Sequence, residues 1–328
     1  MSNTKITLWD GREIPRLGFG CWAIGGPFWA DAVPIGWGEV DDNESKAAIA
    51  AAVDLGVRFF DTADVYGAGH SEKVLGEAIG NNHDVAIATK FGNQFDETTK
   101  QITGKGHDRA YIRSAVEASL RRLKRDAIDL YQLHIDDLDG EDAVETQSAL
   151  EELVKEGKIK AYGWSSDFPK HSSQWVGGEN FKAIQHDLNL FIPANETLKI
   201  VNDNNLVSLN RAPLAMGMLG GAYKVNHTFG QDDVRSIGEP WLDKIAKLDT
   251  VDDAQARFDA VKELLHTGGR TTAQGALGWI WAHNDRALPI PGFRTVAQAK
   301  ENAGALEFGP LDVETLAEID SIIKGEVV

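Results

Sequence analysis

The sequence of 328 residues contains one cysteine, Cys21. A single thiol allows no disulfide within the chain and no metal site built from cysteines. No apolar stretch reaches the roughly 18 residues of a membrane-spanning helix, and the N-terminus lacks the apolar run of a secretory signal. We therefore expect a cytoplasmic protein without a membrane partner.

Positive charge is scarce. The chain has 33 Lys and Arg against 50 Asp and Glu, which gives a net charge of −17. Such a surface repels nucleic-acid phosphates and anionic lipid, so neither is an expected partner. Hydrophobic residues make up 42% of the chain, which is enough for a sizeable core. An anionic cofactor would need a local basic pocket within this acidic chain.

Metal-binding patterns are also missing. The nine histidines are scattered, and neither H-x-H nor H-E-x-x-H occurs. The stretch His134-Ile135-Asp136-Asp137 offers consecutive ligand types, but consecutive residues make a poor rigid cage for a metal. We expect no metal.

Short apolar strands alternate with helical stretches along the chain. Asp10-Gly11 between two alternating segments predicts an N-terminal β-hairpin over residues 5–17. Eight strands are then predicted, over residues 16–20, 57–61, 85–90, 127–134, 159–165, 183–185, 206–209 and 287–290. Strands that alternate with helices indicate a parallel sheet covered by helices.

Eight such units favour a closed barrel over an open doubly wound sheet. An open sheet often carries G-x-G-x-x-G after its first strand, but Gly18-Phe19-Gly20 lacks the third glycine. Asp42 is predicted to cap the first barrel helix, which ends at Gly56. We expect a single (β/α)8 TIM-barrel domain over residues 1–328, with a long loop over 223–268 after the seventh strand.

Polar residues follow three consecutive predicted strands. Asp61 ends the second strand and leads to Tyr66, Lys90 ends the third strand, and His134 ends the fourth. Strand C-termini converge on one face of such a barrel, where catalytic residues lie. Each residue alone has an ordinary structural explanation, such as a turn former, a packed aromatic or a rim histidine. Their joint occurrence at neighbouring strand ends favours a catalytic group.

These four side chains have a coherent chemical use. A tyrosine hydroxyl has a pKa near ~10 and donates protons poorly at neutral pH. A neighbouring ammonium is expected to lower that pKa, and a buried ammonium needs a carboxylate partner such as Asp61. An imidazole can polarise a substrate carbonyl. This is acid catalysis suited to carbonyl reduction, with hydride supplied by a cofactor.

Three motifs resemble those of the aldo-keto reductases. They are Asp61-Thr62-Ala63-Asp64-Val65-Tyr66-Gly67, Ala88-Thr89-Lys90-Phe91-Gly92 and Asp129-Leu130-Tyr131-Gln132-Leu133-His134. The resemblance extends from residue 17 to residue 302. It implies a hydride transfer between NADP(H) and a small aldehyde, ketone, sugar or secondary alcohol. By resemblance, Tyr66 is the acid, Lys90 and Asp61 tune it, and His134 positions the carbonyl.

The resemblance also implies a cofactor site. Ser165 and Gln185 match residues that hold the nicotinamide carboxamide, and Ser166 stands where the family has asparagine. Arg211 stands where the family stacks a tyrosine. The further nucleotide contacts that we expect are Pro213, Leu214, Gly220, Gly292, Arg294, Thr295, Gln298, Glu301 and Asn302.

Arg294 can pair with a 2′-phosphate, which points to NADPH, with NADH possible. The alternative is that Arg294 and Thr295 only open the last barrel helix. Glycines over residues 220–221 suit a close approach to the pyrophosphate, or a simple turn.

The substrate side is expected to be aromatic. Trp22, Phe28, Trp29 and Trp37 follow the first strand and predict a wall beside Tyr66, although some of them could simply fill the barrel mouth. Residues 223–250 are expected to form the opposite wall.

Three hypotheses about the function remain open at this point. The first is carbonyl reduction, whose physiological direction could equally be oxidation of an alcohol or sugar. The second is a Schiff-base aldolase with Lys90 as nucleophile. The third is a subunit without enzymatic activity that binds cofactor and reports redox state. Substrate and oligomeric state are not predicted.

Overall fold

The structure is a computed structural model that describes residues 4–220, 229–237 and 251–324. Its strands are β1 Lys5–Thr7, β2 Glu13–Pro15, β3 Phe19–Gly20, β4 Trp29–Ala30, β5 Val33–Pro34, β6 Phe59–Asp61, β7 Ala86–Phe91, β8 Asn93–Asp96, β9 Gln101–Lys105, β10 Leu130–Leu133, β11 Tyr162–Ser165, β12 Phe181–Asp187, β13 Val207–Arg211 and β14 Ala287–Pro289. Its α-helices are α1 Asp42–Asp54, α2 His70–Ile79, α3 Arg109–Leu123, α4 Gly140–Lys155, α5 Pro169–Ser172, α6 Asn195–Asp203, α8 Val251–Leu265, α9 Thr272–His283, α10 Val296–Phe308 and α11 Val313–Lys324.

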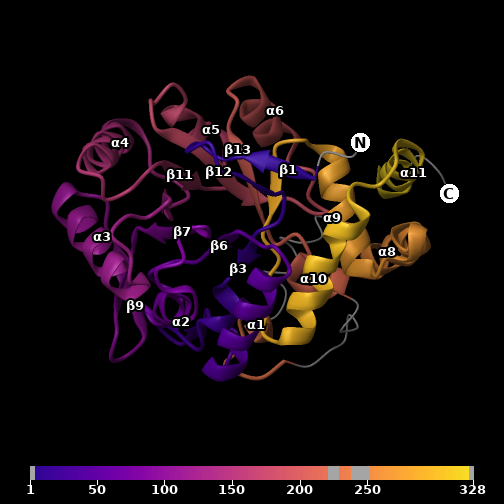
Figure 1. The fold of residues 1–328 in the computed structure, drawn as a ribbon, viewed down its shortest axis with the longest axis horizontal. Helices are drawn as coiled ribbons and strands as arrows, with labels where there is room; N and C mark the ends of the chain where they lie inside the picture. The colour runs from indigo at the N-terminus through magenta and orange to yellow at the C-terminus, as the bar shows by residue number, and fades with distance from the viewer. Residues whose placement is uncertain (1–3, 221–228, 238–250, 325–328) are drawn as a thin grey trace.

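Eight parallel strands form the barrel, in the order β14-β13-β12-β11-β10-β7-β6-β3. The two ends of this order meet, because the amide of Gly18 donates to the carbonyl of Pro289 at 3.0 Å and Gly20 forms a parallel bridge with Gly292. Helices surround the strands (Figure 1). The predicted (β/α)8 barrel is therefore confirmed.

Each predicted barrel strand overlaps an observed strand, but some observed strands are shorter than predicted and others, such as β12, extend beyond the predicted range. Residues 127–134, for example, contain β10 over Leu130–Leu133 only. Ile128 still forms an isolated parallel bridge with Ile159 ahead of the regular strands. The apolar sequence pattern indicates the whole buried segment. The observed strand includes only the part of that segment that forms a continuous hydrogen-bond ladder.

The cap of α1 differs from the prediction by one residue. Asp41 has an extended backbone and its side chain accepts the amide hydrogens of Asn43 and Glu44, so Asp41 is the N-cap. Asp42 is the first helical residue, and its carboxylate contacts His70 instead. The helix ends as predicted just before Gly56, whose φ of 95° suits a residue without a side chain.

The N-terminal hairpin closes one end of the barrel. β1 and β2 pair antiparallel as predicted, and Ile6, Leu8 and Ile14 join a buried cluster with residues of the barrel strands such as Leu130 and Leu209. Residues of β1 also line a cavity together with Phe181 and Val207, which start β12 and β13. The hairpin thus covers the N-terminal ends of the strands, and β1 crosses the barrel in Figure 1. The opposite end is left for a functional site.

That opposite end carries a second sheet, which the sequence pattern did not predict. The loops after β3 and β7 form four short strands in the order β5-β4-β9-β8. Within the predicted long loop over 223–268, the structure describes a 3-10 turn at Val234–Ile237 and helix α8. The predicted second wall of the pocket falls largely on residues 221–228 and 238–250, which lie outside the described residues.

Candidate active site

Asp61, Tyr66 and Lys90 meet at the C-terminal end of neighbouring strands β6 and β7. The ammonium of Lys90 donates to a carboxylate oxygen of Asp61 at 2.6 Å, to the carbonyl of Thr62 at 2.8 Å and to the Tyr66 hydroxyl at 3.2 Å. Lys90 is fully buried and Asp61 is nearly so. Because each contact involves a charged donor, this arrangement fixes the ammonium against the phenol.

Two glutamines hold the other oxygen of Asp61. Gln132 of β10 donates to it at 2.9 Å and Gln185 of β12 donates at 2.8 Å. The carboxylate is therefore satisfied on both oxygens, as a buried charge must be. Lys90 has a fixed ionic partner rather than a mobile one.

Burial and charge act in opposite directions on this group. Burial raises the pKa of Tyr66 above its usual value, and the Lys90 ammonium counteracts this only in part. The expected net lowering by the ammonium is thus not found. Burial pulls the pKa of Lys90 down, but Asp61 outweighs it and the pKa is raised. At neutral pH the phenol keeps its proton and the amine keeps its charge.

His134 lies immediately after β10, and its ring meets that of Tyr66 edge-on with centroids 6.0 Å apart. Burial lowers its pKa well below 6.5, and the cations Lys90 and Arg211 add to this effect. The imidazole is therefore neutral at physiological pH. Its Nδ1 atom is buried and has no hydrogen-bond partner in the described structure. The structure brings all four predicted catalytic residues together.

Aromatic rings line the phenol on its other sides. Trp22 stacks on Tyr66 with centroids 5.9 Å apart, and Trp37 packs edge-on against Trp22 at 5.6 Å. Phe28 is tilted against Tyr66 at 6.5 Å and is almost fully buried. Trp29 lies in β4, where its amide donates to the carbonyl of Lys100. Three of the four predicted aromatics therefore surround Tyr66, directly or through Trp22.

The predicted carboxamide contacts lie at the C-terminal ends of β11 and β12. The Ser165 hydroxyl donates to the side-chain oxygen of Gln185 at 3.2 Å. Ser166 is buried and its hydroxyl is already engaged, because it donates to the carbonyl of Asp136 and accepts from the amide of Phe168. Ser165 and Gln185 thus share one site, whereas Ser166 supports the backbone beneath it.

Arg211 ends β13 beside this site. Its guanidinium donates to Asp187 at 2.8 Å, to Asp167, and to the Ser165 hydroxyl at 3.3 Å. These carboxylates hold the pKa of Arg211 above its usual range against the effect of burial. Because two carboxylates already engage the guanidinium of Arg211, it is poorly placed to hold a phosphate. Its planar group instead provides a flat surface beside Ser165 and Gln185.

The following loop contains the predicted Pro213, Leu214 and Gly220. Leu214 packs on the core, and the loop turns at Ala215, whose amide donates to the carbonyl of Ala212. A Cβ atom on Gly220 would meet nothing within 4 Å, so internal packing does not require glycine there. Gly221 lies outside the described residues.

The predicted adenosine contacts gather where α10 begins after β14. Thr295 caps the helix by accepting the amide hydrogen of Gln298, whose side chain in turn accepts from the amide of Arg294. Asn302 donates back to the carbonyl of Gly292. Glu301 is in the same helix, and its carbonyl accepts from the Gln274 side chain. The Arg294 guanidinium donates to the carbonyls of Trp37 and Glu39.

Several site residues were missed by the sequence analysis. Gln132 lies two residues before His134, and Asp167 and Asp187 lie two residues after Ser165 and Gln185. Side chains two apart in a strand share a face, so this spacing was the available signal. No property of the sequence marked Thr62, which contributes only a backbone carbonyl.

The described residues contain no group of three or more His, Cys, Asp or Glu side chains placed to hold a metal ion. Among those same residues, no helix has the length and apolar character needed to cross a membrane.

Comparison with known proteins decides the family. The profile of the aldo/keto reductase family matches residues 16–324. The chain belongs to the aldo/keto reductase family.

Individual members of the family are similar over nearly the whole chain. The aldo-keto reductase YhdN of Bacillus subtilis is 36% identical over 330 residues, covering 97% of this chain and 92% of that protein. Among solved structures, the glycerol dehydrogenase of Gluconobacter oxydans is 30% identical with a TM-score of 0.84, covering 100% of this chain and 97% of that one. An aldo-keto reductase of Klebsiella pneumoniae in complex with NADPH is 25% identical with a TM-score of 0.72, covering 98% and 96%.

Proposed function

We propose that this aldo/keto reductase transfers hydride between NADP(H) and the carbonyl or secondary alcohol of a small molecule, with Tyr66 as the general acid or base. The observation that carries the proposal is the contact between the Lys90 ammonium and the Tyr66 hydroxyl at 3.2 Å, with Asp61 behind the ammonium at 2.6 Å. The NADPH complex of the Klebsiella pneumoniae relative supports the choice of cofactor.

The residues present fit a dinucleotide along four adjacent strands. Ser165 and Arg211 end β11 and β13, Gln185 lies near the end of β12, and Arg294 lies just beyond β14. Arg294 has no ion pair among the described residues, so its charge is available to a phosphate. When bound, the reduced nicotinamide supplies hydride to the carbonyl carbon. Ser165 and Gln185 would hold its carboxamide.

The protein side of the reaction is proton transfer. Tyr66 gives the proton of its hydroxyl to the carbonyl oxygen as negative charge develops there, and Lys90 stabilises the resulting phenolate. The neutral imidazole of His134 orients the carbonyl without competing as an acid. Trp22 and Phe28 shield this proton from water on the side where they pack. The reverse reaction uses the same groups to oxidise an alcohol.

Oxidation is supported by one relative, since the Gluconobacter oxydans structure is that of a glycerol dehydrogenase. The aldolase alternative loses support, because an ammonium whose pKa is raised by Asp61 is a poor nucleophile. Borohydride in the presence of an aldehyde should therefore leave Lys90 unmodified. Complete assembly of the four catalytic residue types counts against a subunit without activity.

Tyr66→Phe tests the proposal. We expect turnover of a panel of aldehydes and ketones to fall at least about a hundredfold, while NADPH binding measured by fluorescence titration is retained. Tyr162→Phe is the matched control, because the Tyr162 hydroxyl bonds to Glu151 away from the site. A Tyr66→Phe protein that reduces carbonyls as fast as the parent would exclude the proposed mechanism.

A further inference from the structure

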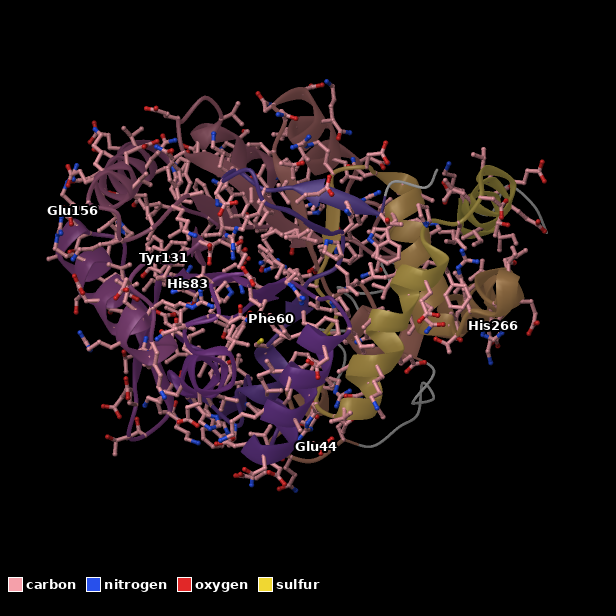
Figure 2. The ribbon with its side chains drawn as sticks, viewed as in Figure 1. Glu44, Phe60, His83, Tyr131, Glu156 and His266 are labelled. Atoms are coloured by element: carbon pink, nitrogen blue, oxygen red, sulfur yellow. The ribbon has the colours of Figure 1, made fainter. Side chains whose placement is uncertain are left out.

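Two helices begin side by side where the last barrel loop meets the first barrel helix. A cavity of about 330 Å³ lies between the start of α1 and the start of α10. Its lining residues are Val40, Asp41, Glu44, Ser45, Arg294, Thr295 and Gln298. Figure 2 labels Glu44 at this end of α1, beside the yellow ribbon of α10.

Both positively and negatively charged side chains line this cavity. Arg294 lines one side and has no carboxylate partner among the described residues. Glu44 and Asp41 line the other side. One carboxylate oxygen of Glu44 accepts the backbone amide hydrogen of Val296 at 2.9 Å, in the first turn of α10. A carboxylate that lines the cavity therefore accepts a hydrogen bond from an amide at the N-terminus of α10.

That position matters because barrels of this kind often bind phosphate at the loops after the seventh and eighth strands, where a helix N-terminus points at the ligand. β14 is the eighth strand and α10 follows it. Free amide groups and Arg294 would attract a phosphate there. Glu44 takes one of those amides and adds negative charge, so it opposes the same phosphate.

We propose that Glu44, with Asp41 beside it, is a specificity-determining residue that limits the preference for a 2′-phosphorylated nucleotide. The preference of the protein for NADPH over NADH is consequently about three- to tenfold smaller than it would be without the Glu44 charge. This inference depends on the proposed function only in assuming that the adenosine end of the cofactor reaches the cavity. Glu44 acts here through its charge, and its hydrogen bond to Val296 is a separate, structural role.

Glu44→Gln separates these two roles. The amide oxygen of glutamine can still accept the hydrogen bond from Val296, so the start of α10 is kept while the charge is removed. Asp42→Asn is the matched control. It removes one negative charge from the same helix turn, but Asp42 faces His70 and does not line the cavity.

The test is calorimetric binding of 2′,5′-ADP and of 5′-AMP, which differ by the phosphate in question and require no catalysis. Glu44→Gln should bind 2′,5′-ADP about three- to tenfold more tightly, with 5′-AMP unchanged, as expected for one partly exposed charge. The gain should shrink as salt is added. Arg294→Ala should weaken 2′,5′-ADP and leave 5′-AMP unchanged, and Asp42→Asn should match the parent.

Fluorescence titration of the parent and of Glu44→Gln with NADH and NADPH completes the test. A Glu44→Gln protein whose preference for NADPH over NADH equals that of the parent, or whose affinity for 2′,5′-ADP is unchanged, would overturn the inference. Either result leaves the proposed reductase activity standing. Failure to bind NADPH and NADH at all would instead remove the proposed function, together with this inference.

Discussion

The side-chain amide of Gln185 donates to the carboxylate of Asp61 at 2.8 Å, across the barrel end from β12 to β6. The same side chain accepts a hydrogen bond from Ser165, the other residue expected to hold the nicotinamide carboxamide. One glutamine therefore touches both the group that fixes Lys90 and the proposed cofactor site. In the proposed mechanism, cofactor binding and proton transfer would therefore share Gln185.

Gln185→Leu should damage both functions. The substitution keeps the approximate volume but removes a donor to a buried carboxylate, which is worth about 1.5–3 kcal/mol for a charged acceptor. We expect a roughly tenfold or greater fall in kcat together with a weaker affinity for NADPH. Gln132→Leu is the control, because Gln132 donates to the same oxygen at 2.9 Å but lies opposite Gly163 of β11, whereas Gln185 lies opposite Ser165.

Gln132→Leu should lower kcat while the dissociation constant of NADPH stays close to that of the parent. Stopped-flow turnover and fluorescence titration measure the two quantities separately. Equal losses of NADPH affinity in both variants would show that Gln185 has no contact with the cofactor beyond its support of Asp61.

Asp61→Asn should alter the pH dependence of the reaction. Both Tyr66 and Lys90 have raised pKa values, so the parent should reduce carbonyls at a constant rate from about pH 7 to pH 9. Without the Asp61 carboxylate, burial dominates and the pKa of Lys90 falls. The ammonium then loses its proton as pH rises through that lower value, and activity is lost with it.

A profile of kcat/KM against pH measures this change. The descending limb of Asp61→Asn should move to lower pH relative to the parent, in addition to a lower maximum. Profiles of the two proteins that differ only in height would indicate that Asp61 does not set the protonation of Lys90.

The barrel was predictable because each of its parts has a local sequence signal. Apolar runs give the strands, and glycines such as Gly56 end the helices with a positive φ. The clustering of the proposed catalytic residues was predictable for a related reason. Asp61, Lys90 and His134 are polar residues at the ends of apolar strands, where burial makes a polar side chain conspicuous.

The remaining parts depend on contacts between distant segments. The sheet formed by β4, β5, β8 and β9 has only short strands, and its pairing of Trp29 with Gln101 joins two separate loops. No repeating hydrophobic pattern within either loop indicates that the two loops pair. The pKa of Tyr66 was misjudged because the sequence shows the cation but not the burial, and burial has the larger effect. Glu44 could not be linked to Val296 before the fold placed α1 against α10.

A buried histidine outside the catalytic group should make stability depend on pH. His186 is 1% exposed, and its Nε2 atom accepts from the Ser208 hydroxyl at 2.7 Å. Asn210 donates to the same hydroxyl, whose hydrogen remains free to point at the imidazole. The Nδ1–H group then donates to the carbonyl of Asp187 at 3.0 Å. The neutral ring completes this chain of hydrogen bonds, and burial disfavours a second proton on the imidazole.

Burial lowers the pKa of His186 to about 4, with Asp167 opposing and Arg211 supporting the shift. The unfolded chain takes up a proton near pH 6.5, whereas the folded protein does not, so stability is present above that pH and is lost as pH falls. The loss expected from this residue is about 2 kcal/mol of unfolding free energy between pH 7 and pH 5.

Urea unfolding of the parent and of His186→Gln at both pH values checks this prediction. Glutamine keeps donor and acceptor groups but does not titrate, so other acidic and basic groups contribute equally to both proteins and cancel in the comparison. The parent should lose about 2 kcal/mol more than the variant on acidification, whatever the cost of the substitution at pH 7. Parallel losses in the two proteins would mean that His186 accepts a proton in the folded state, contrary to the hydrogen-bond chain through Ser208.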